Sequence, residues 1–308
     1  ITKYEKDAKK VVSYMVKEFE MKKAADQYAR ASVSKTGSLD MGRLHTYKYN
    51  DDLFKKVTTL PGAPSHGLVM FLDWSGSMQY NISGTMKQLF NLVWFCNRVK
   101  IPFEVYAFTD QMGGRWKTNK DVAYIANQKT KAGDLKVEYV HLLNFMSSRM
   151  TKTELKKMTH QLFMLSESFA PYRDWQEKGY PKRPIKDLYL GGTPLNAAIV
   201  TAMDLLPKFK SETGVQKVNT IFLTDGASHD MNNFYTNAIN KDGDIVESQG
   251  YFGTKKTVFT DPISNTKVFY KEELGRRYYG WDVQTQLFLK LLKARMPEMN
   301  IVGFFIAG

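Results

Sequence analysis

Residues 68–77 read LVMFLDWSGS, an apolar run that opens into three alternating oxygen-bearing side chains. Those side chains are Asp73, Ser75 and Ser77. Side chains two positions apart project to the same side of an extended segment, so one carboxylate and two hydroxyls can converge on one point. Mg²⁺ prefers oxygen ligands and takes about six of them. The stretch therefore predicts a buried strand that ends in a cation-binding loop.

Three other apolar runs in the chain share this pattern. They lie at residues 103–108, 219–223 and 301–306. Each run is continuous rather than alternating, which is typical of strands buried on both faces of a parallel sheet. Each also ends on polar or small residues, at the sheet edge where open α/β sheets collect their ligands.

Amphipathic segments between these runs predict helices. They lie at residues 78–98, from Thr193-Pro194 onward, and at residues 282–295. Thr193 is an acceptable N-cap, and proline belongs at the first helical position. Strands that alternate with helices in this way predict an α/β fold, doubly wound around a mostly parallel central sheet.

The remaining segments predict additions to this fold. Residues 1–60 form a helical N-terminal arm with a short lead-in, and residues 61–308 form the main domain. Two insertions, at about 111–190 and 226–281, exceed a minimal alternation of strand and helix. The first contains helical patterns, and the second contains a hairpin that pairs residues 257–260 with 268–270.

Composition indicates a globular protein with an uneven charge distribution. The 308 residues are 43% hydrophobic and carry a formal net charge of +13. Lys plus Arg outnumber Asp plus Glu by 13 to 8 in residues 1–60 and by 15 to 8 in residues 111–190, but equal them at 3 to 3 in residues 61–110. Basic residues interleaved with acids indicate a solvated surface or an acidic protein partner, so nucleic-acid binding is an alternative that is not favoured.

The cysteine content and the hydropathy pattern indicate the compartment. Cys96 is the single cysteine, so an internal disulfide is excluded, and its apolar neighbours indicate a buried thiol. No apolar run approaches the ~18 residues that a membrane-spanning helix needs. We therefore expect a cytoplasmic protein without membrane partners.

Two further segments bring oxygen ligands to the same edge of the predicted sheet. Thr193 lies in GGTP at residues 191–194, and Asp225 lies in TDG at residues 224–226. The expected ligand set is Asp73, Ser75, Ser77, Thr193 and Asp225. Mg²⁺ suits this set, with Mn²⁺ or Ca²⁺ as alternatives.

Two other interpretations of the loop are open. In one, Ser77 caps the following helix and Asp73 accepts backbone hydrogen bonds. In the other, a serine is a nucleophile, but the Gly-x-Ser-x-Gly elbow is absent and His229 is the only histidine near the site in sequence. No Walker-type phosphate loop is present, so we expect no intrinsic catalysis.

In order and strand context, the ligand set resembles the metal-ion-dependent adhesion site (MIDAS) of von Willebrand factor A (VWA) domains. That site has a D-x-S-x-S loop, a threonine on a second loop and an aspartate on a third. The resemblance implies that Asp73, Ser75, Ser77, Thr193 and Asp225 hold the ion, directly or through water. It also implies that the ion accepts an Asp or Glu from a protein ligand.

A narrower resemblance extends the match from residues 66–308 back to about residue 37. The segment GSLDMGRL at 37–44, followed by DWSGSM at 73–78, is similar to the CobT-type cobaltochelatase subunit. The segment GGTPL at 191–195 is similar to magnesium-chelatase D-type subunits. These families imply a partner AAA+ ATPase of the MoxR or CobS type, and related pairs occur in large bacteriophages, which would place the protein in the host cytoplasm.

The sequence therefore predicts a metal-dependent protein-binding subunit that partners an AAA+ ATPase in a chelatase-like or remodelling complex. One alternative is a non-catalytic subunit of a cobalt or magnesium chelatase, which inserts metal into a tetrapyrrole. A second alternative is a basic nucleic-acid-binding protein, whose binding would fall steeply with salt.

Overall fold

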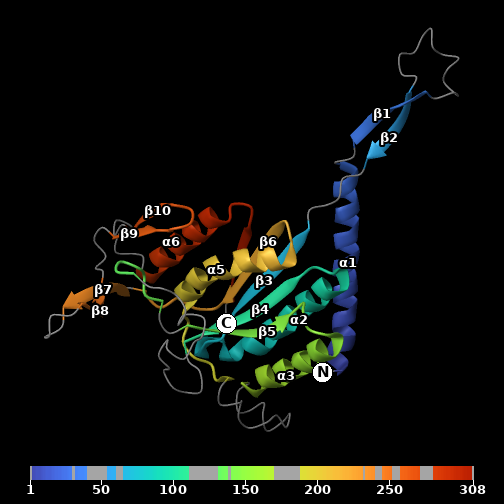
Figure 1. Cartoon of the computed structure of the whole chain (residues 1–308). Helices are drawn as coiled ribbons and strands as arrows, with labels where there is room; N and C mark the ends of the chain where they lie inside the picture. The colour runs from blue at the N-terminus through green and yellow to red at the C-terminus, as the bar shows by residue number, and fades with distance from the viewer. Residues whose placement is uncertain are drawn as a thin grey trace. The chain divides into compact units, whose positions relative to one another are not determined.

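The computed structural model places the chain in two compact units, Thr2–Ser65 and His66–Gly308 (Figure 1). The residues that it describes are 2–29, 32–39, 54–59, 65–110, 131–137, 140–169, 188–231, 233–239, 245–251, 257–270 and 280–306.

The smaller unit contains one long helix and one hairpin. Helix α1 spans Thr2–Ala29 and matches the amphipathic segment expected near the N-terminus. Strand β1 (Ser32–Leu39) pairs antiparallel with β2 (Phe54–Thr59). The described part of the lead-in is therefore extended.

The larger unit is a mixed α/β fold around a five-stranded sheet in the order β11-β6-β3-β4-β5. Its strands are β3 (His66–Asp73), β4 (Phe103–Thr109), β5 (His141–Ser147), β6 (Lys217–Thr224) and β11 (Asn300–Phe305). The pairs β11/β6, β6/β3 and β3/β4 are parallel, so the sheet is mostly parallel, as the sequence predicts.

Strand β5 is the exception in the sheet, and the sequence did not predict it. It pairs antiparallel with β4, and the register shifts between Val105 and Tyr106. Its sequence, HLLNFMS, is not continuously apolar, since the exposed Asn144 interrupts the run. Strand β11, at the other edge, does have an apolar run, but it is mostly exposed, so the expectation that residues 301–306 are buried on both faces is wrong.

The described helices that flank the strands of the larger unit are α2 (Ile82–Val99), α3 (Lys152–Ser168), α5 (Leu195–Thr213) and α6 (Gly280–Arg295). Their existence was predicted, but two of their starts were wrong. A 3-10 turn, η2, occupies Gly76–Tyr80, so α2 begins at Ile82 rather than at 78. Helix α5 is capped by Pro194 rather than Thr193, because the Thr193 carbonyl accepts a hydrogen bond from the His229 amide across the loop, at 3.1 Å.

Two hairpins lie in the segment predicted as the second insertion. Strand β9 (Thr257–Thr260) pairs antiparallel with β10 (Lys267–Tyr270), which confirms the predicted hairpin. Strand β7 (Asn233–Ile239) pairs with β8 (Ile245–Tyr251), and this hairpin was not predicted. The Asp261 carboxylate after β9 pairs with Arg295 at the end of α6, joining the hairpin to the helix.

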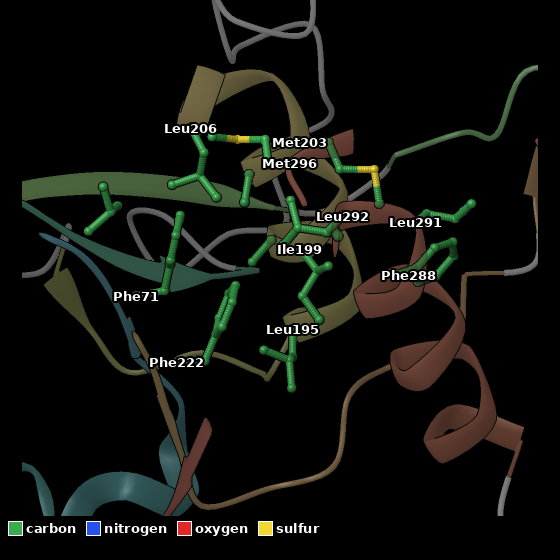
Figure 2. Packing of buried hydrophobic residues seen from close by; sticks show 14 of the residues in the cluster. Phe71, Leu195, Ile199, Met203, Leu206, Phe222, Phe288, Leu291, Leu292 and Met296 are labelled. Carbon is green, nitrogen blue, oxygen red and sulfur yellow. The ribbon is translucent and has the colours of Figure 1, made fainter. Parts of the chain in front are cut away.

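The central strand β3 is buried on both faces. Val69 and Phe71 join a cluster with the apolar faces of α5 and α6, and the Phe71 ring stacks on Phe222 at a centroid distance of 4.9 Å. Figure 2 shows Phe71 and Phe222 beside the α5 and α6 side chains of this cluster. Met70 and Leu72, which alternate with them, are also fully buried. The continuous apolar run of residues 68–72 therefore has the environment that the sequence predicts.

Cys96 lies on α2 and is 1% exposed. The prediction of a buried thiol is therefore confirmed, and burial raises the pKa of this thiol to about 12. Across the described residues, no helix combines the length and the apolar character that spanning a membrane requires.

Candidate functional site

The parallel register brings three strand ends to one edge of the sheet. Strand β3 ends at Asp73, β6 ends at Thr224 and β4 ends at Thr109. Leu72 stands opposite Leu223 in the ladder, so the next residues of β3 and β6, Asp73 and Thr224, are neighbours. Side chains far apart in sequence therefore meet at this edge.

Asp73 is fully buried, and its two carboxylate oxygens have different surroundings. Oδ2 accepts a hydrogen bond from Thr224 Oγ1 at 2.6 Å. Oδ1 has no hydrogen-bond partner within the described residues. Burial raises the pKa of Asp73 to about 7, and the negative charge of Asp225 adds to the rise, while the bond from Thr224 opposes it. The site thus holds a carboxylate that a nearby positive charge would stabilise.

A chain of hydroxyls connects the first loop to the third. Ser77 Oγ donates to Asp225 Oδ1 at 2.7 Å, and Ser75 Oγ lies 3.0 Å from Ser77 Oγ. Ser75 is buried and Ser77 is exposed. Ser75, rather than Ser77, occupies the N-cap of η2, and its side chain makes no capping hydrogen bond. The interpretation of Ser77 as a helix cap is therefore wrong.

The second loop is fastened to the first by backbone hydrogen bonds. Gly191 forms an isolated parallel bridge with Ser75. The Gly76 amide donates to the Gly191 carbonyl at 2.8 Å, and the Gly191 amide donates to the Trp74 carbonyl at 3.0 Å. Thr193, two residues further on, is 7% exposed.

Gly226 shows that the three loops converge. A Cβ on this residue would lie 3.5 Å from Thr193 Oγ1 and 3.7 Å from Ser77 Oγ. The structure therefore brings together all five residues of the predicted ligand set. The sequence pattern did not single out Thr224, the residue whose hydroxyl donates to Asp73 Oδ2. Its place directly before Asp225 at the strand end was the available signal.

The donor set fits a hard divalent cation. Asp73 and Asp225 would supply carboxylate oxygens, and Ser75, Ser77 and Thr193 would supply hydroxyl oxygens. The buried, unpaired Oδ1 of Asp73 is the observation that favours this fit. Within the described ranges, no cluster of three or more His, Cys, Asp or Glu residues could hold a metal ion, so such a site would depend on hydroxyl ligands.

His229 contacts the second loop through its backbone and approaches Asp110 with its ring. Its amide donates to Thr193, and its Nδ1 lies 3.9 Å from Asp110 Oδ2. Asp110 Oδ1 accepts a hydrogen bond from the Gly192 amide at 2.5 Å. Asp110 therefore reaches a residue 82 positions away in the sequence.

Comparison with known proteins gave structural matches only. No family model matches the chain, and no curated protein matches it. The pilus adhesin SpaC from Lactobacillus rhamnosus GG, in its open conformation, matches with 13% identity and a TM-score of 0.39, covering 79% of this chain and 24% of that one. A mutant of the PilB minor pilin from Streptococcus sanguinis matches with 9% identity and a TM-score of 0.33, covering 83% and 62%. The chain thus spans less than two thirds of either protein.

These findings overturn the family assignment made from sequence. The structures that match are a pilus adhesin and a minor pilin, and no family model or curated protein supports a VWA, CobT-type or D-type chelatase relation, whether bacterial or phage-encoded. That assignment is wrong. It depended on five oxygen-bearing residues near strand ends and on the short segments at 37–44 and 191–195. Such patterns describe ligand chemistry and do not by themselves define a family.

Proposed function

We propose that the strand-end site binds a divalent cation of the Mg²⁺ class and, through it, an acidic side chain of a partner protein. The observation that carries the proposal is Asp73, whose fully buried carboxylate leaves Oδ1 unpaired among the described residues. An unpaired buried carboxylate oxygen costs free energy. A cation would remove that cost by supplying both the missing partner and the opposite charge.

The side chains around Asp73 have different roles in the proposed cation site. Asp225 brings the second carboxylate, and Thr224 holds Asp73 Oδ2 in place. Ser77 is exposed and bonded to Asp225, so the opening of the site lies on the Ser77 side. When bound, the cation supplies positive charge and open coordination positions for a ligand oxygen. Two carboxylates neutralise the charge of the cation. Its remaining coordination positions can then take a carboxylate from a partner.

Two parts of the sequence-based hypothesis remain proposals with some support. The burial of β3 on both faces supports a doubly wound arrangement of helices, and the single buried cysteine supports a reducing, cytoplasmic location. The AAA+ ATPase partner, tetrapyrrole chelation and nucleic-acid binding stay predictions, since no described contact bears on them.

Calorimetric titration of the EDTA-treated protein with Mg²⁺ tests the cation. We expect one binding event that Asp73→Asn abolishes. Glu104→Gln is the matched control, because Glu104 is a buried carboxylate at the other end of the neighbouring strand β4, where Asn144 and Ser147 pair with it. Equal Mg²⁺ binding by wild type and Asp73→Asn would refute the site.

Water-proton relaxation of the Mn²⁺-loaded protein tests the carboxylate ligand. An Asp-containing peptide should displace metal-bound water and lower the relaxation enhancement, whereas the same peptide with Asn should not. If both peptides act alike, or if neither acts while Mn²⁺ is bound, the ion does not capture an acidic side chain.

A further inference from the structure

Asp110 is a buried carboxylate beside the cation site that the proposed ligand set does not use. It follows β4 directly and is 0% exposed. Its Oδ1 accepts the hydrogen bond from the Gly192 amide. Its Oδ2 has no hydrogen-bond partner among the described residues and lies 3.9 Å from His229 Nδ1. Burying a carboxylate costs more free energy than a single backbone hydrogen bond returns, which points to a functional role for Asp110.

The geometry of Gly192 shows how closely Asp110 and His229 enclose the second loop. A Cβ on Gly192 would lie 2.4 Å from Asp110 Oδ2 and 2.6 Å from His229 Cε1. A methyl group on Gly192 would force at least one of these two side chains to shift. By contrast, a Cβ on Gly76 would meet its nearest atom, the Gly191 carbonyl oxygen, at 3.8 Å. Among Gly76, Gly192 and Gly226, only Gly192 has such a tight contact.

The residue after Gly192 is Thr193, whose hydroxyl belongs to the ligand set. The loop is fixed on both sides of this hydroxyl, at Gly192 by Asp110 and at the Thr193 carbonyl by the His229 amide. Three successive residues, Gly191, Gly192 and Thr193, thus each have a backbone group with a partner outside the loop. These bonds fix the backbone from which the Thr193 side chain extends.

We propose that Asp110 is a positioning residue for the cation site, acting through Gly192 to hold the Thr193 hydroxyl at the ion. This inference rests on the proposed cation binding. Groups that orient a metal ligand without touching the metal usually change its affinity by about 10- to 100-fold when they are removed. We expect Asp110→Ala to weaken Mg²⁺ binding by roughly that factor, and Asp110→Asn, which keeps an acceptor oxygen for Gly192, to weaken it less.

A double-mutant cycle in Mg²⁺ titrations tests the inference. If Asp110 acts through Thr193, Asp110→Ala should have little further effect in a Thr193→Ala background. Glu104→Gln is the control for loss of a buried carboxylate on β4, the strand that Asp110 follows. An equal loss of affinity in both backgrounds, or an Asp110→Ala variant that binds Mg²⁺ like wild type, would overturn the positioning role.

Amide hydrogen exchange of the metal-free protein separates this inference from the proposed function. Asp110→Ala should speed exchange at Gly192, and Asp110→Asn should preserve its protection, so the conservative variant covers any failure of Asp110→Ala to fold. Unchanged Gly192 exchange in Asp110→Ala overturns the anchor. Faster Gly192 exchange with unchanged Mg²⁺ affinity overturns only the link to the ion. A wild type that binds no Mg²⁺ refutes the proposed function, and the positioning role with it.

Discussion

Asp73 makes the stability of the metal-free protein depend on pH. The folded protein raises the pKa of Asp73 to about 7 from an ordinary value near 4, so the folded state holds this proton more tightly than the unfolded state. The stabilising effect is complete at pH below about 4 and is lost as the pH rises to about 7. The difference amounts to roughly 4 kcal/mol at most, since one pKa unit corresponds to about 1.4 kcal/mol.

We therefore expect urea unfolding of the metal-free protein to show lower stability at pH 8 than at pH 5. Asp73→Asn should remove most of that difference, because the amide carries no proton to lose. Mg²⁺ should restore the stability of wild type at pH 8 and have little effect on the variant. A pH dependence that is identical in wild type and Asp73→Asn would contradict this account of the Asp73 environment.

Gly226 offers a way to fill the site without removing a ligand. A methyl group on this residue would lie at ordinary contact distance from the Thr193 and Ser77 hydroxyls, so the fold should accept it. Gly226→Ala should nevertheless weaken Mg²⁺ binding by about tenfold or more, because an apolar group would stand between two ligand hydroxyls. Gly76→Ala is the control, and it should bind Mg²⁺ like wild type in the same titration.

Helices α2 and α5 end in the same backbone conformation with different residues. Lys100 after α2 has φ 57°, and Gly214 after α5 has φ 66°. Each amide donates to a carbonyl four residues earlier, closing the last turn. Glycine adopts this left-handed conformation freely, whereas lysine meets a steric penalty.

The pair gives opposite expectations for stability. Lys100→Gly should stabilise the protein by up to about 1 kcal/mol, and Gly214→Ala should destabilise it by about the same amount. The changes in thermal midpoint should therefore have opposite signs. If both midpoints shift in the same direction, the left-handed backbone conformations at positions 100 and 214 do not control the stability change.

Among the helices and strands, the sequence predicted those that have a strong local pattern of their own. The apolar runs of β3, β4, β6 and β11 were found because each is continuous. Strand β5 was missed because its pairing with β4 compensates for a weak local pattern. The start of α5 was misplaced because Thr193 is engaged by His229, 36 residues later, and its own residue type does not reveal that contact.

The larger unit has one apolar cluster that joins the sheet to α5 and α6. Leu292 of α6 lies inside it with no exposed surface, while Phe269 of β10 is 63% exposed. Leu292→Ala should lower the free energy of unfolding by about 2 to 5 kcal/mol through lost burial and an unfilled cavity. Phe269→Ala should change it by less than 1 kcal/mol, and urea denaturation measures both.

For the whole molecule, the sequence predicted a ligand set and assigned the wrong family. Asp73, Ser75 and Ser77 are close in sequence, and their strand context placed Thr193 and Asp225 nearby. The hydrogen bonds that hold this set, between Thr224 and Asp73 and between Asp110 and Gly192, join residues far apart in the sequence. No local sequence pattern reveals them. Five oxygen ligands indicate what could bind, but they do not identify the ancestry of a chain of 308 residues.

The buried thiol on α2 can be used to measure how often the larger unit opens. Cys96 is the single cysteine and is protected by burial, so a thiol reagent can react only while the larger unit opens around α2. The labelling rate in native buffer therefore measures the frequency of that opening without any introduced probe. Comparison of this rate with and without Mg²⁺ would show how far an ion at one sheet edge slows the exposure of a helix that supplies none of its proposed ligands.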